Sequence, residues 1–277
     1  MSSSPQPEDL QAQIRYLTEQ LQRVNRERIE YLQNVSHQMV APLNAMKWHI
    51  ENLTGGRVRD LERIRKVLRS VYSQATLAVH LAKNFSLMSN LESDHTLKSL
   101  REPLQAVSLS QQAVNLADDF QPLGWDKQVN ISVDDRLLKQ APSVLVIKPL
   151  ISQVFSNVIE NAVKYSDRLT AIRIDGCYIP ERDAVSVSVH NFGIPLPHAD
   201  TQRVFERGYR TSEAKSVYPA GTGFGLYIAK KIVEIHQGEI TAATEGRKTI
   251  FTVTLPVKAL ASEAKQDHAK NSPISRR

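Results

Sequence analysis

The 277-residue sequence has a single cysteine, and only 6% of its residues are aromatic. One cysteine, Cys177, excludes an internal disulfide framework and is typical of a reducing compartment, so we expect a cytoplasmic protein. No apolar run approaches the roughly 18 residues that span a bilayer, and the opening MSSSPQPEDLQAQ lacks the regions of a signal peptide. The net charge of +6 is spread without a dense basic run, which gives no support for nucleic-acid binding. A hydrophobic content of 41% is enough to build a core.

In the N-terminal segment, apolar residues recur at alternating steps of four and three. They are Leu10, Ile14, Leu17, Leu21 and Val24, then, after a break at Arg28, Tyr31 and Val35. Such a seam buries one narrow stripe of a helix against another helix. A single surface helix packed on its own domain is the alternative, but about four heptads of repeat favour a coiled coil. We expect residues 1–30 to form a coiled-coil signal helix, with its partner helix in a second copy of the chain.

The helical pattern continues through NAMKWHIENL and stops at Gly55 and Gly56, because glycine ends helices well. A second helix is predicted from Val58 to Leu91. Two long helices joined by a tight turn predict an antiparallel hairpin over residues 31–95. Two such hairpins would form a four-helix bundle.

A proline lies inside the first of these helices, five residues after a histidine. Pro42 removes a backbone donor from the helix at a cost of about 3 kcal/mol, which suggests that a bend near His37 has a use. The alternative is that the helix ends at Ala41 and that His37 is an ordinary surface residue.

Residues 103–257 read as a mixed helix and strand region, an α+β domain with a largely antiparallel sheet. Helices are predicted at Leu109–Leu123, Ser143–Tyr165 and Gly223–His236. Strands are predicted at Asn130–Val133, Ala171–Tyr178, Ala184–His190, Glu239–Glu245 and Thr249–Leu255. Residues 258–277 are polar with little periodicity, and we expect a disordered tail.

The predicted helix PLISQVFSNVIENAVKYSD carries Asn157, Asn161 and Lys164 on one face. Asparagine offers a carbonyl oxygen to a cation and an amide group to a phosphate. Magnesium usually keeps several waters, so one asparagine can be its only protein ligand. Taken alone, the three residues are more typical of the solvated face of an amphipathic helix.

Two glycine-containing stretches follow. VSVSVHNFGIPLP turns sharply at Asn191 and Gly193, where the backbone could approach a flat ring closely. In PAGTGFGLYIAKK, Gly221, Gly223 and Gly225 alternate just before a helix, whose N-terminal N–H groups and dipole favour phosphates. The polar segment ERGYRTSEAKSVYPA before it is long enough to be a mobile lid. Alone, the first stretch is a turn and the second is a weak motif.

The order of these pieces resembles the catalytic core of two-component sensor histidine kinases. VSHQMVAPL is similar to the phosphoacceptor box, NVIENAVKYS to the N-box, NFGIPLP to the first glycine box, VFERGYR to the F-box, GTGFGLYIAKKIVEIHQG to the second glycine box and KTIFTVTLP to the closing strand. The resemblance covers roughly Arg28 to Pro256. It implies a dimeric helical hairpin over residues 31–95, then a two-layer ATP-binding sandwich of the histidine kinase-like ATPase type over residues 103–257.

The resemblance implies a protein-histidine kinase that uses ATP and Mg²⁺. His37 would accept the γ-phosphoryl group and pass it to an aspartate of a response regulator, and Pro42 would let the bundle bend below it. The implied ATP-binding residues are Asn157, Asn161, Lys164, Tyr165, Asn191, Gly193, Arg210, Gly221, Thr222, Gly223, Gly225 and Leu226. Asn161 is the implied magnesium ligand, and Arg210 would approach the phosphates or brace the lid. We expect the regulator to dock near Met39, Leu43 and Lys47, and the input to come from a separate sensor protein or from the rest of a longer chain.

The sequence departs from the family pattern around the histidine and at the adenine position. Gln38 stands where the family usually has an acid, Val40 where it has a basic residue, and Ala41 where it has the Thr or Asn used in dephosphorylating the regulator. Asn191 replaces an aspartate, and Pro195 replaces the second glycine of its box. These departures keep open a kinase-like scaffold that binds nucleotide and regulates a partner by shape. An ATPase or chaperone on the same nucleotide fold is a third reading, but it leaves the histidine hairpin unexplained.

The substitution Gln38→Glu tests the role of the position after the histidine. Glutamine can accept a hydrogen bond from the imidazole but brings no charge and cannot take up a proton. General-base effects are worth about 10²–10⁴ in rate, so we expect slow autophosphorylation that Gln38→Glu accelerates. An unchanged or lower initial rate with labelled ATP would refute this role.

Overall fold

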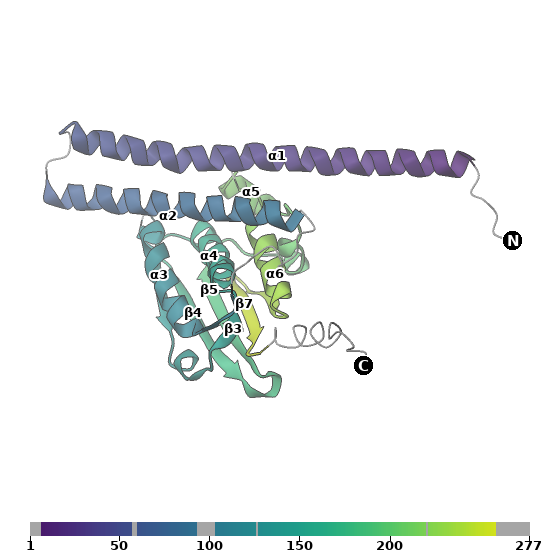
Figure 1. Ribbon diagram of the computed structural model, residues 1–277. Helices are drawn as coiled ribbons and strands as arrows, with labels where there is room; N and C mark the ends of the chain where they lie inside the picture. The colour runs from purple at the N-terminus through teal and green to yellow at the C-terminus, as the bar shows by residue number, and fades with distance from the viewer. Residues whose placement is uncertain (1–6, 57–59, 93–102, 126, 220, 259–277) are drawn as a thin grey trace, which may run out of the picture.

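The computed structural model describes residues 7–56, 60–92, 103–125, 127–219 and 221–258. Two long helices, α1 (Pro7–Thr54) and α2 (Leu61–Glu92), form an antiparallel hairpin across one end of an α/β domain (Figure 1). The helix runs unbroken through Pro42, so it does not end at Ala41, and no break separates residues 7–30 from the hairpin. In these ranges no helix has the length and apolar character to cross a membrane.

The main sheet of the α/β domain has five strands. In spatial order they are β2 (Asn130–Asp134), β4 (Ala171–Ile179), β5 (Ala184–Phe192), β7 (Lys248–Pro256) and β6 (Glu239–Glu245). β2 and β4 are parallel, and the other neighbours are antiparallel. The mixed fold class predicted from the sequence is therefore confirmed, with a sheet that is largely antiparallel.

Two short strands were not predicted. β1 (Gln105–Val107) and β3 (Val144–Val146) form a separate antiparallel pair. The helix expected from Ser143 therefore begins later, as α4 (Lys148–Tyr165), because the β-branched run before it is a strand and Pro149 lies in its first turn. The helix expected from Gly223 begins two residues later, as α6 (Gly225–Ile235).

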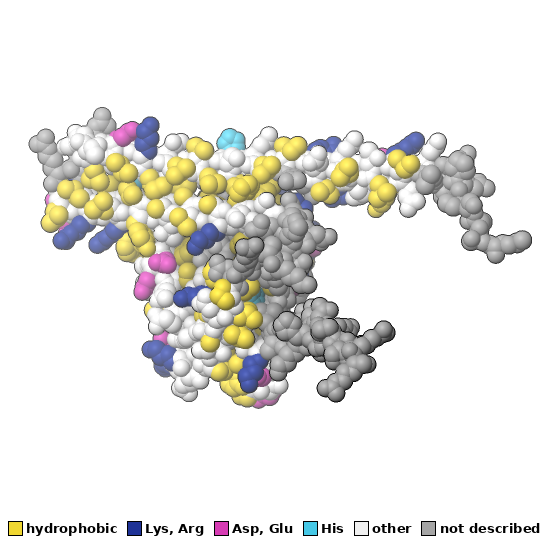
Figure 2. All heavy atoms as spheres, viewed as in Figure 1, with side chains coloured by type: hydrophobic (Ala, Val, Ile, Leu, Met, Phe, Trp, Pro, Cys, Tyr) yellow, Lys and Arg dark blue, Asp and Glu magenta, His cyan; other side chains and the backbone are white. Residues whose placement is uncertain are grey.

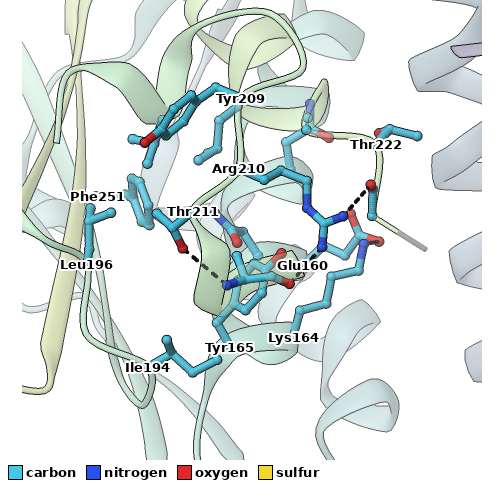
Figure 3. Close-up of a pocket in the computed structure, with 18 of the residues that line it drawn as sticks. Glu160, Lys164, Tyr165, Ile194, Leu196, Tyr209, Arg210, Thr211, Thr222 and Phe251 are labelled. Atoms are coloured by element: carbon cyan, nitrogen blue, oxygen red, sulfur yellow. Dashed lines mark hydrogen bonds and ion pairs between the residues drawn. The ribbon is translucent and has the colours of Figure 1, made fainter. Parts of the chain in front are cut away.

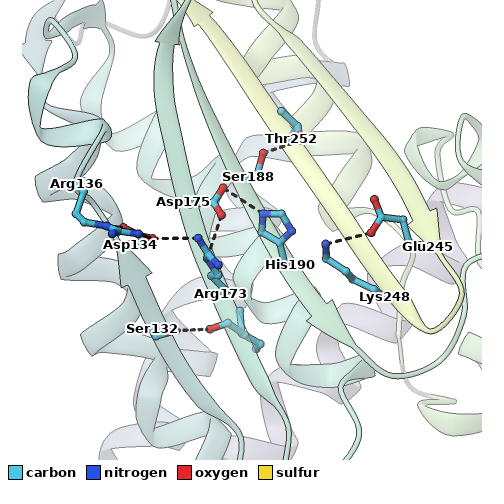
Figure 4. Close-up of polar contacts among 11 residues, drawn as sticks. Ser132, Asp134, Arg136, Arg173, Asp175, Ser188, His190, Glu245, Lys248 and Thr252 are labelled. Carbon is cyan, nitrogen blue, oxygen red and sulfur yellow. Dashed lines mark hydrogen bonds and ion pairs between the residues drawn. The ribbon is translucent and has the colours of Figure 1, made fainter.

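Helices cover one face of the sheet, and the other face is polar. α3 (Leu109–Trp125), α4 and α6 lie over the covered face, and α5 (Ser212–Val217) lies near the hairpin (Figure 1). On β5, Val187 and Val189 are buried, while Ser188 and His190 alternate with them on the open face. There His190 Nε2 lies 3.2 Å from Asp175 Oδ1 (Figure 4). Because side chains alternate between the two faces of a strand, Asn191, two residues after Val189, faces the helices as the valines do.

The hairpin packs against the α/β domain through aromatic and cation–π contacts. Arg69 Cζ lies 5.0 Å from the Trp125 ring centroid, the Tyr31 and Phe224 centroids are 4.2 Å apart, and His80 meets Phe120 edge-on at 5.9 Å. These contacts fix α2 along α3 and bring α1 to the start of α6.

Apolar side chains also remain exposed along the hairpin (Figure 2). They include Ile14, Leu17, Leu21 and Val24 of the predicted seam, and Val40, Leu43, Trp48 and Leu68 beyond it. Tyr31 and Val35, which continue the seam, are instead buried in the core of this chain. The coiled coil and the four-helix bundle with a second copy stay predictions.

The buried His236 gives the α/β domain a pH-dependent stability. Its Nε2 accepts from the Ile147 N–H at 3.1 Å and its Nδ1 donates to the Ile232 carbonyl at 2.8 Å, so the ring is neutral. Burial lowers the pKa of His236 below its usual 6.5. As the pH falls below about 6.5, the unfolded chain binds a proton that the folded chain refuses. The free energy of unfolding should therefore fall by up to about 1.4 kcal/mol per pH unit until the folded pKa is reached.

Urea unfolding at pH 7.5 and 5.5 measures this loss. His236→Gln should remove it, whereas His198→Gln, at an exposed histidine, should retain it. Equal pH dependence in the two variants would contradict the assignment.

Candidate functional site

The site begins with α4, an amphipathic helix. Ile151, Val154 and Val158 are buried on its apolar side, and burying each such side chain stabilises the fold by about 1.5–3 kcal/mol. This packing fixes the rotation of α4. Its polar residues Asn161 and Lys164 then line a cavity of about 140 Å³. Figure 3 shows Lys164 in this cavity.

The cavity gathers the residues that the sequence singled out. All the predicted ATP-binding residues except Gly193 line it: Asn157, Asn161, Lys164, Tyr165, Asn191, Arg210, Gly221, Thr222, Gly223, Gly225 and Leu226. Asn191 reaches it because it is in phase with Val187 and Val189 on β5, and its side chain is 2% exposed. The predicted residues, which extend from Asn157 to Leu226 in the sequence, thus meet at one site.

Gly193 lies behind the cavity wall. It pairs with Ser166 in an isolated antiparallel bridge next to the end of α4. A Cβ atom on Gly193 would lie 1.9 Å from the Tyr165 carbonyl oxygen. Only glycine lets the two backbones approach in this way, so Gly193 shapes the pocket without lining it.

Several lining residues were not predicted. They are Leu81, Asn84, Glu160, Ile194, Leu196, Val204, Tyr209, Thr211, Ala214, Thr249 and Phe251. Thr249 and Phe251 alternate on β7, and Tyr209 and Thr211 flank Arg210, so the strand period and the F-box position were usable signals. Leu81 and Asn84 come from α2, and no local pattern could have placed them there.

A buried carboxylate lies under the polar face of α4. Glu160 is 7% exposed, and its oxygens lie 2.8 Å from Lys164 Nζ and 3.1 Å from His80 Nε2. Burial opposes ionisation of Glu160, but the Lys164 ammonium and the His80 imidazole together hold its pKa below the usual range. Burial likewise opposes the charge on Lys164, and Glu160 more than compensates, so the Lys164 pKa is raised. Lys164 is therefore cationic at neutral pH.

The segment before α6 is held together by Arg210. Its guanidinium donates to the carbonyls of Ala214 at 2.7 Å, Pro219 at 3.1 Å and Gly221 at 2.7 Å, and also to that of Tyr218. In Figure 3, Arg210 lies on the same side of the pocket as Lys164 and Thr222. Of the two roles expected for Arg210, the contacts in this structure are those of a lid brace.

The predicted lid segment lies beside the lysine and leads into the N-terminus of α6. The Tyr218 ring lies 4.7 Å from Lys164 Nζ. Gly223 has φ of +73°, a conformation that favours glycine, and it turns the chain into α6. A Cβ on Gly225, the first residue of α6, would lie 3.3 Å from Asn157 Oδ1. The N-terminus of α6 thus faces the same asparagine that α4 presents, which suits an anionic ligand.

His37, the predicted phosphoacceptor, and the next residue, Gln38, lie on different sides of α1. His37 is exposed on α1 and is not among the residues lining the cavity. Gln38, the next residue, is 7% exposed and lines it. Successive helix residues are about 100° apart around the axis, so the pocket faces Gln38 in this structure and not His37.

The polar groups of the pocket suit a nucleotide with a hydrated divalent cation. The amide Nδ2 of Asn157 is buried without a hydrogen-bond partner, and Asn161 presents an amide to the same space. Within the described residues, no group of three or more His, Cys, Asp or Glu could hold a metal. A cation here would take most of its ligands from water and phosphate, as magnesium commonly does.

Comparison with known proteins agrees with this geometry. Residues 147–259 match the family model described as histidine kinase-, DNA gyrase B- and HSP90-like ATPase. The chain is 30% identical over 244 residues to the sensor histidine kinase WalK of Bacillus subtilis (strain 168), covering 87% of this chain and 38% of that protein. It is 30% identical over 257 residues to the sensor protein kinase WalK of Staphylococcus saprophyticus, covering 88% of this chain and 39% of that protein. The chain thus spans about two fifths of the length of these relatives.

A solved structure shares the fold. The structure titled full-length ShkA in complex with AMPPNP superposes with a TM-score of 0.53 over 84% of this chain and 47% of that chain, at 21% identity. The chain therefore contains an ATPase domain of the histidine kinase-, DNA gyrase B- and HSP90-like type. Together with its long N-terminal helices, it constitutes the catalytic core of a protein of the sensor histidine kinase family.

The substitution Gly193→Ala tests the close approach behind the pocket. The added methyl would collide with the Tyr165 backbone, so the free energy of unfolding should fall by at least about 2 kcal/mol. Gly246→Ala is the matched control, since a Cβ there meets nothing within 4 Å, and its positive φ costs about 1–2 kcal/mol. Urea titrations of both variants measure the difference. A smaller loss at Gly193 than at Gly246 would contradict the clash.

Proposed function

We propose that this chain is a histidine kinase that transfers the γ-phosphoryl group of ATP to His37 and then to an aspartate of a response regulator. The observation that carries the proposal is the gathering of Asn157, Asn161 and Lys164 with the glycine segment before α6 in one cavity. The names of the relatives and the AMPPNP complex of the structural neighbour support it.

Within the proposal, each polar residue has a role toward ATP. Asn191 accepts from the adenine amino group, and the N-terminal N–H groups of α6 meet the phosphates. Asn161 is the metal ligand, and Mg²⁺, when bound, neutralises charge on the phosphates. Lys164 adds a positive charge beside them. Arg210 keeps the lid in register.

The transfer step forms one bond and breaks one. A ring nitrogen of His37 uses its lone pair to bond the γ-phosphorus, and the bond from that phosphorus to the β–γ bridging oxygen breaks, so ADP leaves with the electron pair. The other ring nitrogen then loses its proton. Gln38 cannot take up that proton, so water receives it, which is the physical reason to expect a slow reaction.

Gln38 also favours a second candidate function, a scaffold that binds nucleotide without efficient phosphoryl transfer. Gln38 lines the pocket where His37 would have to be, and neither Ala41 nor Val40 supplies the polar group or charge usual in the family. A partner would then sense the nucleotide-dependent position of the hairpin.

The substitution Asn161→Ala tests the nucleotide site. Because it removes the proposed metal ligand, calorimetry with AMPPNP and magnesium should show a loss of binding of at least about tenfold. Asn115→Ala, at an exposed asparagine of α3, is the matched control and should bind as the unsubstituted chain does. Magnesium-dependent binding retained by Asn161→Ala would overturn the assignment.

Incubation with γ-labelled ATP separates the functions. The kinase predicts acid-labile label that is absent from His37→Gln. Binding without label supports the scaffold, and steady phosphate release without label supports an ATPase. Transfer of label to a purified response regulator would establish the second step.

A further inference from the structure

The candidate nucleotide pocket is narrow in this structure, and the hairpin forms part of its wall. Its volume of about 140 Å³ is below the roughly 300–1,000 Å³ of small-molecule sites. One wall is formed by Gln38 of α1 and by Leu81 and Asn84 of α2. The ATPase fold alone therefore does not set the size of the pocket.

A chain of side-chain amides joins α2 to α4 at this wall. Asn84 Nδ2 donates to Asn157 Oδ1 at 2.7 Å. Asn84 Oδ1 accepts from Gln153 Nε2 at 2.9 Å. The carbonyl oxygen of Asn157, which would otherwise be available to a ligand, is thus occupied by a residue of the hairpin.

His80, one turn before Asn84 on α2, extends the chain to the buried carboxylate. Its Nδ1 accepts from Gln153 Nε2 at 2.8 Å, and its Nε2 donates to Glu160 at 3.1 Å. The hairpin therefore contacts Glu160, the partner that holds Lys164 at 2.8 Å. His80 is 4% exposed and Gln153 is 3% exposed, so these bonds are shielded from water and stronger than at the surface.

We propose that His80 and Asn84 of α2 form an autoinhibitory contact with Gln153, Asn157 and Glu160 of α4, which the phosphates of ATP must displace. This contact cluster holds the phosphate side of the pocket shut and keeps Gln38, in place of His37, against it. The inference rests on the proposed nucleotide binding and adds its regulation. Movement of α2 away from α4 frees Asn157, enlarges the pocket and releases α1 to reorient.

The contact cluster reduces the apparent affinity for nucleotide. Only the fraction of molecules with the hairpin displaced accommodates the phosphates, so the measured dissociation constant for ATP is the intrinsic one divided by that fraction. A signal that shifts α1 and α2 would change this fraction without touching the pocket chemistry.

The substitution Asn84→Ala breaks the cluster at its half-buried end and leaves the predicted ATP-binding residues intact. Without the Asn84 side chain, Asn157 Oδ1 has lost this hydrogen bond in the closed state, so the closed state is less stable. The variant should therefore bind AMPPNP with magnesium about two- to tenfold more tightly than the unsubstituted full chain does. Adenosine, which has no phosphates, should gain less. Displacement of a fluorescent nucleotide analogue measures both affinities.

Two further variants of the chain supply a control and an independent test. Asn44→Ala, at an exposed asparagine of α1, is the matched control and should bind like the unsubstituted chain. His80→Ala removes a different contact of the same cluster and should also tighten nucleotide binding. Thermal unfolding verifies that each variant is folded. Equal or weaker binding by folded Asn84→Ala and His80→Ala, with normal binding by the unsubstituted chain, overturns the inhibitory contact and leaves the proposed function standing. Absence of binding by every protein overturns both.

Discussion

The ion pair between Glu160 and Lys164 is the interaction on which the site depends. A buried carboxylate is costly unless it is paired and hydrogen-bonded, and Glu160 is satisfied from two sides, by Lys164 at 2.8 Å on its own helix and by His80 at 3.1 Å on α2. The first contact keeps a cation at the phosphate side of the pocket. The second joins the helical hairpin to the ATPase domain. One side chain thus couples the chemistry of the pocket to the position of the hairpin.

The fold makes this coupling because α4 is packed on several sides. Its apolar side packs on the sheet and against α6, its polar side forms the pocket, and α2 lies across the polar side near its middle. A displacement of α2 therefore changes the pocket directly, without a long path through the core. The departure at Gln38 fits this arrangement, since burying a neutral amide at the pocket wall costs less than burying an unpaired carboxylate.

Much of the fold could be predicted from residues close together in sequence. The period of 3.6 gave α3 and the hairpin helices, and the period of two gave β5 and β7 and the phase that turns Asn191 inward. The failures also have local causes. The helix predicted from Ser143 includes the residues of β3, because three apolar residues directly before a helix resemble the first turn of that helix. Its partner β1 is too short to show a period.

The sequence by itself determined the family, the residues of α4 and of the glycine segment that gather at the pocket, and the one-sided character of the sheet, since each depends on spacing within a short segment. Only the tertiary structure decided that Gln38 and not His37 faces the pocket, that Arg210 donates to carbonyls of the segment before α6, and that Asn84 donates to Asn157. These facts depend on how a helix is rotated and on which distant segment packs against it. Both are set by packing summed over many residues, which no single motif encodes.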